Sequence, residues 1–210
     1  EEALQKLRAY GWEPESNDLH ASLAAFEVAP AVSVTFANAL ARASVKDHLC
    51  GFSYAATTAA GGVTPLAAAA LAGMFASGNG VPPSSGVQLI NNRGKLGPAR
   101  DFLSVSSSGL ADWNTEGALC LRNLVTGSDA AARKLQAGLD ETRRNGNLRG
   151  KPAIIVHGRA DALLPVNHTS RPYAALNRKV EGAASKLRYV EVTNAQHFDG
   201  FIGLPAVLPG

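Results

Sequence analysis

Apolar residues run without alternation over residues 151–158, Lys-Pro-Ala-Ile-Ile-Val-His-Gly, between a proline near the start and a glycine at the end. Short unalternated runs of this kind are typical of strands buried on both faces of a parallel sheet. Residues 187–192, Leu-Arg-Tyr-Val-Glu-Val, predict a second strand. Apolar residues between the two runs recur at helical spacing, at Tyr173, Leu176 and Val180. The pattern therefore predicts an α/β fold in which a crossover helix joins two parallel strands.

Residues 1–150 show helical spacing and no convincing buried strand. Caps, stops and apolar periodicity predict helices that end at Gly11 or cover the ranges 17–27, 31–45, 64–77, 112–125 and 128–144. Residues 77–109 are dense in Gly, Pro, Ser and Asn, which predicts a long functional or mobile loop. We therefore expect a mainly helical, lid-like insertion over residues 1–150, before a sheet segment over 151–210.

A lid excludes water from a reacting ester and shapes the pocket that receives it. The large aromatic residues of the insertion are candidates for this pocket, although each is more often plain core. They are Phe52, Tyr54, Phe75, Phe102 and Trp113. None is assigned as a binding residue.

Two residues with acid–base chemistry follow the predicted strands. Asp161 lies just after the first strand, and His197 lies just after the second. Because the carboxyl ends of parallel strands meet at one edge of a sheet, we expect both side chains at that edge. A carboxylate that holds an imidazole is the acid–base half of a Ser-His-Asp triad, and the order nucleophile, acid, histidine is that of α/β-hydrolases. The alternative is that Asp161 caps a helix and His197 caps a turn.

Size, charge and cysteine content narrow the class of protein. The 210 residues allow a sizeable core, and the net charge of +3 with scattered Lys and Arg does not suggest nucleic-acid binding. The most apolar run, residues 65–76, is too short to span a membrane. The chain begins without methionine or a signal-type stretch, so we expect a piece of a longer protein. Cys50 and Cys120 form either one disulfide or two buried thiols, and thiols are favoured because a core of this size needs no crosslink.

The remaining histidines do not indicate a metal site. They are His20, His48, His157 and His168, and no pair has metal-ligand spacing on one element. We expect His157 to be a satisfied structural histidine and His168 to lie near a helix start. The sequence predicts neither a metal ion nor a cofactor.

Four stretches give a more specific resemblance. They are Pro-Ala-Ile-Ile-Val-His-Gly-Arg-Ala-Asp-Ala-Leu-Leu-Pro-Val-Asn-His-Thr-Ser-Arg-Pro-Tyr (152–173), Asn-Ala-Gln-His-Phe-Asp-Gly-Phe (194–201), Phe-Glu-Val-Ala-Pro-Ala-Val-Ser-Val-Thr-Phe (26–36) and Val-Lys-Asp-His-Leu-Cys-Gly-Phe-Ser-Tyr-Ala (45–55). The chain is similar over nearly its whole length to the D-(-)-3-hydroxybutyrate oligomer hydrolases. The resemblance implies the C-terminal part of an α/β-hydrolase fold, in a secreted or periplasmic serine esterase that cleaves short 3-hydroxybutyrate oligomers in polyhydroxybutyrate degradation.

The nucleophile has no good candidate in this sequence. No Gly-x-Ser-x-Gly occurs, nor does a Ser-x-Ser-Asn-Gly-Gly elbow like that of the resembling family. Ser53 lies in the nearest imitation, Gly-Phe-Ser-Tyr-Ala, but residues 45–50 are too polar for the buried strand that leads into an elbow. We interpret Ser53 as a lid residue and expect the serine and the oxyanion hole in the remainder of the same hydrolase. A general carboxylesterase, another α/β-hydrolase and a non-catalytic binding module of this fold stay open as alternatives.

Overall fold

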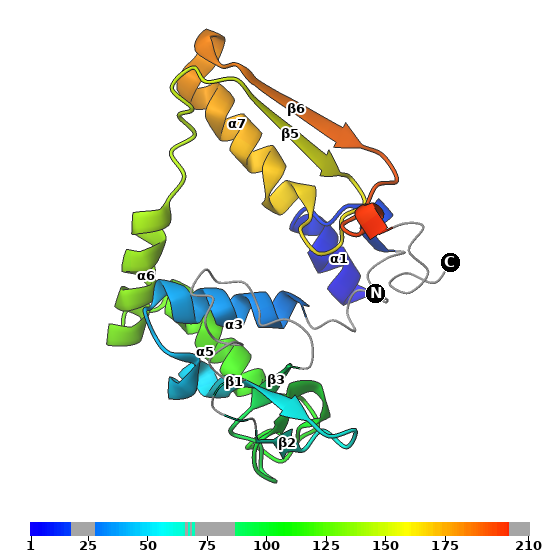
Figure 1. Ribbon diagram of the computed structural model, residues 1–210, viewed down its shortest axis with the longest axis vertical. Helices are drawn as coiled ribbons and strands as arrows, with labels where there is room; N and C mark the ends of the chain where they lie inside the picture. The colour runs from blue at the N-terminus through cyan, green and yellow to red at the C-terminus, as the bar shows by residue number, and fades with distance from the viewer. Residues whose placement is uncertain (18–27, 66, 68, 70–86, 202–210) are drawn as a thin grey trace. The chain divides into compact units, whose positions relative to one another are not determined.

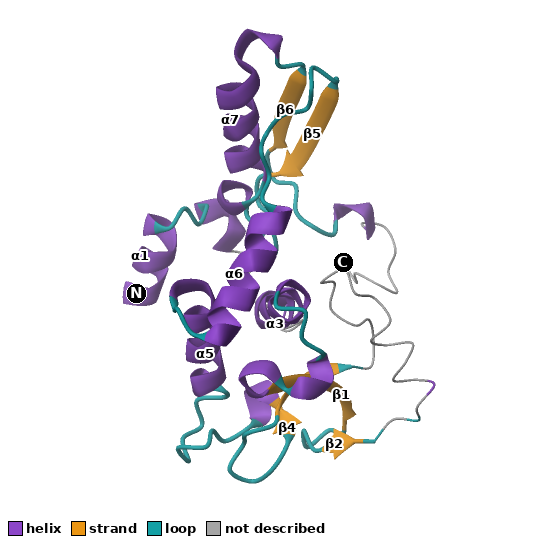
Figure 2. Cartoon of the chain, turned by 90° about the vertical axis from the view of Figure 1, so that its left-hand side faces the viewer, coloured by secondary structure: helices purple, strands orange, loops and turns teal. Residues whose placement is uncertain are grey.

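The computed structural model describes all residues except 18–27, 66, 68, 70–86 and 202–210. The chain divides into two compact units, one formed by Glu1–Phe26 with Arg144–Gly210 and the other by Glu27–Arg143 (Figures 1 and 2). Both contain helices and a small sheet, so the described fold is mixed α/β. Within the described part of the chain, the longest apolar helices fall short of what a membrane crossing requires.

The first unit contains the predicted pair of parallel strands. Strand β5 (Ala153–Gly158) pairs with β6 (Leu187–Val192) from Ala153↔Leu187 to Gly158↔Val192, and helix α7 (Ser170–Glu181) connects them. Figure 1 shows α7 alongside both strands. The N-terminal part of this unit contributes helix α1 (Glu2–Ala9) and the 3-10 turn η1 (Pro14–Ser16), and the loop before α7 contains the turn η5 (Val166–His168). The predicted β–α–β order and the parallel pairing are confirmed.

One face of the β5–β6 pair is exposed, which differs from the expected burial on both faces. Ile154 and Val156 on β5 are 71% and 64% exposed, and Val190 and Val192 on β6 are also exposed. The alternate residues of both strands, which include Ile155 and Tyr189, are partly buried. The difference has a physical reason: within the described residues of this unit the sheet has two strands, so α7 covers one face and leaves the other bare.

The second unit contains four strands that the sequence did not predict. Strands β1 (Phe52–Thr57), β2 (Val63–Thr64), β3 (Gln88–Asn91) and β4 (Ala99–Arg100) form an antiparallel sheet in the order β2-β1-β3-β4. The expectation that residues 1–150 contain no convincing buried strand is therefore wrong, because Phe52 and Tyr54 in β1 and Leu89 and Ile90 in β3 are buried. The expected loop over 77–109 contains β3 and β4, and its first ten residues lie outside the described residues.

Helices α3 (Val28–Leu40), α5 (Thr115–Thr126) and α6 (Ala130–Thr142) complete the second unit and confirm three predicted helices. Their buried residues share a core with the sheet, and the Tyr54 hydroxyl donates to the Ala31 carbonyl at 2.6 Å. Gly138 lets α6 approach α3 closely, because a Cβ there would lie 2.1 Å from the Leu40 carbonyl oxygen. The helices expected over 17–27 and 64–77 fall almost entirely outside the described residues.

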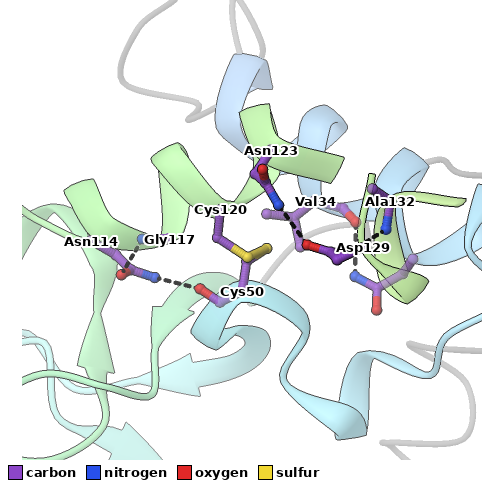
Figure 3. The surroundings of a disulfide bond; sticks show 9 residues. Val34, Cys50, Asn114, Gly117, Cys120, Asn123, Asp129 and Ala132 are labelled. Carbon is purple, nitrogen blue, oxygen red and sulfur yellow. Dashed lines mark hydrogen bonds between the residues drawn. A yellow bond between two sulfur atoms is a disulfide. The ribbon is translucent and has the colours of Figure 1, made fainter. Parts of the chain in front are cut away.

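Cys50 and Cys120 form a disulfide in the second unit, so the favoured alternative of two buried thiols is wrong. Figure 3 shows the bond between the turn before β1 and helix α5, and the Cα atoms of the two cysteines are 5.5 Å apart. Asn114 reinforces the junction, because its side chain donates to the Cys50 carbonyl at 3.2 Å and accepts from the Gly117 N–H at 2.9 Å. The disulfide thus joins two segments that are 70 residues apart in the chain, which the size of the core did not indicate.

Removal of this disulfide should lower the stability of the second unit. Closing a loop of 70 residues restricts the unfolded chain, and native disulfides of this kind contribute about 2–4 kcal/mol. The double variant Cys50→Ser/Cys120→Ser should therefore unfold at a lower denaturant concentration than the wild type, as measured by circular dichroism in urea. Reductant should shift the wild type in the same direction and leave the double variant unchanged. Equal midpoints for the oxidised wild type and the double variant would contradict this expectation.

Candidate functional site

Asp161 occupies a tight turn just beyond the carboxyl end of β5. Its backbone N–H donates to the Gly158 carbonyl at 3.2 Å, and the residue is 5% exposed. Oδ1 of its carboxylate accepts hydrogen bonds from the backbone N–H groups of Leu163 at 2.9 Å and Leu164 at 2.8 Å. These two donors fix the plane of the carboxylate and leave Oδ2 as the oxygen that faces other side chains.

The loop that carries His197 is hydrogen-bonded to the loop that carries Asp161. The Arg159 N–H donates to the Val192 carbonyl at 2.9 Å, and the Ala160 N–H donates to the Ala195 carbonyl at 3.0 Å. Gly158 makes this close approach sterically feasible, because a Cβ there would lie 2.5 Å from the Ala195 carbonyl oxygen. The parallel register and these cross-links bring the two loops together at one edge of the sheet, as the sequence predicted.

Asp161 and His197 form a hydrogen-bonded pair. Nδ1 of His197 lies 3.0 Å from Oδ2 of Asp161, and the histidine side chain is 35% exposed whereas that of the aspartate is 6% exposed. Burial disfavours the charge of Asp161, but the Leu164 N–H, the His197 ring and the Leu163 N–H outweigh it, so the pKa of this carboxyl is lowered from its ordinary value. Asp161 is thus an anion that accepts the Nδ1 proton of His197.

A carboxylate at Nδ1 fixes the tautomer of an imidazole and directs its Nε2 lone pair away from the carboxylate. In this state His197 can take a proton from a hydroxyl group at Nε2, and the anionic Asp161 stabilises the imidazolium that results. A carboxylate at Nδ1 and a free Nε2 are the features that an acid–base pair requires. The catalytic role of the two residues stays a prediction.

His157 also lies at Asp161, which the sequence analysis did not foresee. As expected, it is satisfied, because its Nδ1 lies 2.6 Å from the Ser170 hydroxyl. Its Nε2, however, lies 3.5 Å from Oδ2 of Asp161. Ser170 in turn contacts the Tyr189 hydroxyl, which donates to Glu191. The sequence signal for this network is the alternation of Tyr189 and Glu191, which places both on one face of β6.

Ser53 and His168 lie in positions unlike those of catalytic groups. Ser53 is the second residue of β1, whereas a nucleophile elbow is a sharp turn at the end of a strand. The Ser53 Oγ accepts from the Asn92 side chain at 2.6 Å. His168 is exposed in the turn η5 just before α7, near a helix start as expected.

The second unit contains an apolar pocket of about 510 Å³ between α3, α5 and α6. Phe52 and Trp113 line it, and Phe102 lies beside Trp113 with ring centroids 6.3 Å apart. Tyr54 is a core residue bonded to Ala31, and Phe75 lies outside the described residues. The volume falls in the range of ligand sites, and Arg122 supplies a cationic group among its lining residues.

No group of three or more metal-ligating side chains occurs among the residues placed by the structure. The absence of a metal or cofactor from the working protein stays a prediction. Stoichiometric zinc in the purified protein, or loss of activity on chelation, would contradict it.

Comparison with known proteins gives one consistent family. The family model described as 3HB-oligomer hydrolase matches residues 1–210. A D-(-)-3-hydroxybutyrate oligomer hydrolase of Paracidovorax citrulli is 71% identical over all 210 residues of the chain, which correspond to 30% of that relative. Relatives with the same name from Ralstonia pickettii and Cupriavidus necator are 61% and 64% identical over 100% and 96% of the chain, and each match covers 28% of the relative. The chain thus spans less than a third of the length of these curated relatives. No solved structure matches the chain.

Proposed function

The chain belongs to the 3HB-oligomer hydrolase family, and from this membership we propose that it provides the acid and the base of a serine esterase that cleaves short D-3-hydroxybutyrate oligomers to monomers. Asp161 is the proposed acid and His197 the proposed base. The serine nucleophile and the oxyanion donors are proposed to lie in a remainder of the same enzyme, outside these 210 residues. The fold that unites these parts is proposed to be that of the α/β-hydrolases.

The proposed chemistry uses the free Nε2 of His197. This nitrogen takes the proton of the serine hydroxyl as the serine oxygen bonds to the ester carbonyl carbon. As the acyl C–O bond breaks, the imidazolium gives the proton to the departing alkoxide oxygen of one 3-hydroxybutyrate unit, which leaves as a hydroxyl, and the acyl group stays on the serine. Water, deprotonated by His197, releases the acyl group and regenerates the serine. Asp161 stabilises the imidazolium in both halves of the cycle.

A single observation carries the proposal: the pair joined by the 3.0 Å contact between Nδ1 of His197 and Oδ2 of Asp161. A binding module has no need of a buried carboxylate against a partly exposed imidazole, because burial of a charge is costly. The pair also follows two neighbouring parallel strands, the arrangement in which open α/β sheets hold their catalytic groups.

The exposed face of the β5–β6 pair supports a contribution from additional chain. Four large aliphatic side chains lie on this face: Ile154, Val156, Val190 and Val192. Parallel strands are normally covered on both faces, and a two-stranded sheet is marginally stable alone. Because the relatives are more than three times as long as this chain, we propose that further strands and helices of such a polypeptide cover this face and bring the serine to His197.

The second unit is proposed to act as a lid, and its apolar pocket is a candidate for the acyl part of the ester. The Cys50–Cys120 disulfide supports a secreted or periplasmic location, because disulfides persist in oxidising compartments.

The proposal is tested with a polypeptide of the relatives' length that carries this sequence. It should hydrolyse the dimer and trimer of D-3-hydroxybutyrate faster than a simple short-chain ester and faster than the solid polymer. A preference for the simple ester would favour a general carboxylesterase, and no hydrolysis of any ester would favour a binding module.

The 210-residue chain alone should release no 3-hydroxybutyrate above the rate in buffer. Without a nucleophile and oxyanion donors, the acid–base pair has little to act on except water. Dimer hydrolysis by this chain is measured after circular dichroism has shown that it is folded. Turnover by the chain that is abolished in Ser53→Ala would contradict the proposal and would identify Ser53 as the nucleophile.

A further inference from the structure

Two imidazole rings lie near the same carboxylate oxygen of Asp161, the proposed acid of the acid–base pair. Oδ1 of Asp161 is occupied by two backbone N–H groups, so Oδ2 alone faces His197 at 3.0 Å and His157 at 3.5 Å. If both rings donated a proton to Oδ2, they would share the charge that supports the base. The tautomer of His157 therefore determines how much of the Asp161 charge is available to His197.

A hydrogen-bond chain behind His157 begins at an ion pair. Nε and Nη2 of Arg171 donate to the two carboxylate oxygens of Glu191 at 2.5 and 2.6 Å. The Arg171 guanidinium lowers the pKa of Glu191 to about 2, so this carboxylate is ionised and can only accept hydrogen bonds. Glu13 and Asn167 accept from Nη1 of Arg171 and hold the guanidinium in place.

The proton of Tyr189 is committed to this carboxylate. Its hydroxyl donates to Oε1 of Glu191 at 2.8 Å. Burial of the ring and the neighbouring Glu191 raise the pKa of Tyr189, so the hydroxyl keeps its proton at neutral pH. A phenol has one proton, and therefore the 2.9 Å contact between Tyr189 and Ser170 requires Ser170 to be the donor.

The same count applied to Ser170 assigns the proton of His157. The Ser170 hydroxyl donates its one proton to Tyr189, so in its 2.6 Å contact with Nδ1 of His157 it must accept a hydrogen bond. Nδ1 of His157 is then protonated, and a neutral ring, which has one N–H, has no proton on Nε2. The 3.5 Å between Nε2 and Oδ2 of Asp161 agrees with this assignment, because it exceeds the usual N–H···O range of about 2.7–3.2 Å.

We propose that His157 is a positioning residue for the acid–base pair: the chain Ser170–Tyr189–Glu191–Arg171 holds it in the Nδ1–H tautomer, so that it packs against Asp161 without donating to Oδ2. The inference rests on the proposed function in that it takes Asp161 and His197 as the acid and the base. A donating His157 would draw negative charge from Oδ2 and weaken the support that Asp161 gives to the imidazolium of His197.

The tautomer is tested by nitrogen NMR of a polypeptide of the relatives' length labelled with ¹⁵N only in its histidine rings, at about pH 8, where an ordinary histidine is neutral. His157→Gln identifies the signals. The wild type should show a protonated Nδ1 and an unprotonated Nε2 at His157. A ring protonated at Nε2, or at both nitrogens, would overturn the inference.

The role of the chain is tested by Tyr189→Phe. Without the phenol oxygen, Ser170 is free to donate to Nδ1, and the ring of His157 can place its proton on Nε2 toward Asp161. The variant should shift His157 to the Nε2–H form and lower kcat for the dimer about tenfold, the effect of one hydrogen bond to a charged group, with little change in KM. Ser170→Ala should act in the same direction and serves if Tyr189→Phe does not fold.

Tyr173→Phe is the matched control, because Tyr173 lies on α7 and its hydroxyl has no side-chain hydrogen bond among the described residues. It should change neither the tautomer nor kcat. A shifted tautomer with an unchanged kcat would overturn the positioning role. If the wild type does not hydrolyse the oligomers, the proposed function fails, whereas the NMR result still decides the tautomer.

Discussion

His197→Ala should remove nearly all hydrolysis of 3-hydroxybutyrate oligomers by a polypeptide of the relatives' length that carries this sequence. The Nε2 of His197 is the proposed acceptor of the serine proton, and water at the position of the lost ring is a far weaker base. Deletion of a triad base lowers turnover by on the order of a thousand-fold or more. The rate of dimer hydrolysis measures the loss, which should appear in kcat with little change in KM.

The fold should survive this substitution, because the His197 side chain is 35% exposed and, among the described residues, pairs with Asp161 and lies nearly perpendicular to the Phe198 ring. His168→Ala is the matched control, since it removes an exposed imidazole from the same unit and should leave the rate nearly unchanged. Equal thermal midpoints for both variants would show that the comparison concerns chemistry. A folded His197→Ala protein with the wild-type rate would end the assignment of His197 as the base.

The strands β5 and β6 could be predicted because their signals are local. Proline and glycine bound the first strand, helical spacing marks the crossover, and both strands extend over six residues. The strands of the second unit are harder to predict because β2 and β4 contain two residues each, and because β1 pairs with β3, a segment far along the chain. Periodicity needs longer segments than these.

The acid and base could be placed from the sequence because position after a parallel strand determines where a residue lies on the sheet. The network around His157 could not be predicted from the sequence, since it joins Glu13 and Arg171, which are 158 residues apart. The disulfide could not be predicted either, because spacing alone does not show whether two cysteines face one another. These features depend on tertiary contacts, and they determine how the predicted pair is held.

Asp161→Asn should be almost as damaging as loss of the base, and the reason lies in the two N–H groups at Oδ1. Leu163 and Leu164 both donate there, so the amide of asparagine must place its oxygen at that position. Its NH₂ group then points at Nδ1 of His197, where two donors would face one another. The His197 ring avoids this clash of donors by carrying its proton on Nε2. In that tautomer Nε2 cannot accept a proton from serine.

The expected loss of kcat for Asp161→Asn is on the order of a thousand-fold or more, measured on the dimer. The matched control is Glu15→Gln, which removes a half-exposed carboxylate from the same unit, where it pairs with Arg159, and should change kcat little.

The pH dependence of stability gives a second readout. Because the pKa of Asp161 is lowered in the folded state, its ionised form contributes stability that is present above about pH 4 and lost as pH falls through the folded value. The difference in unfolding free energy between wild type and Asp161→Asn should therefore be largest above about pH 4 and shrink below it. A difference that grows as the pH falls would show that Asp161 is not the buried anion on which the proposed acid–base pair depends.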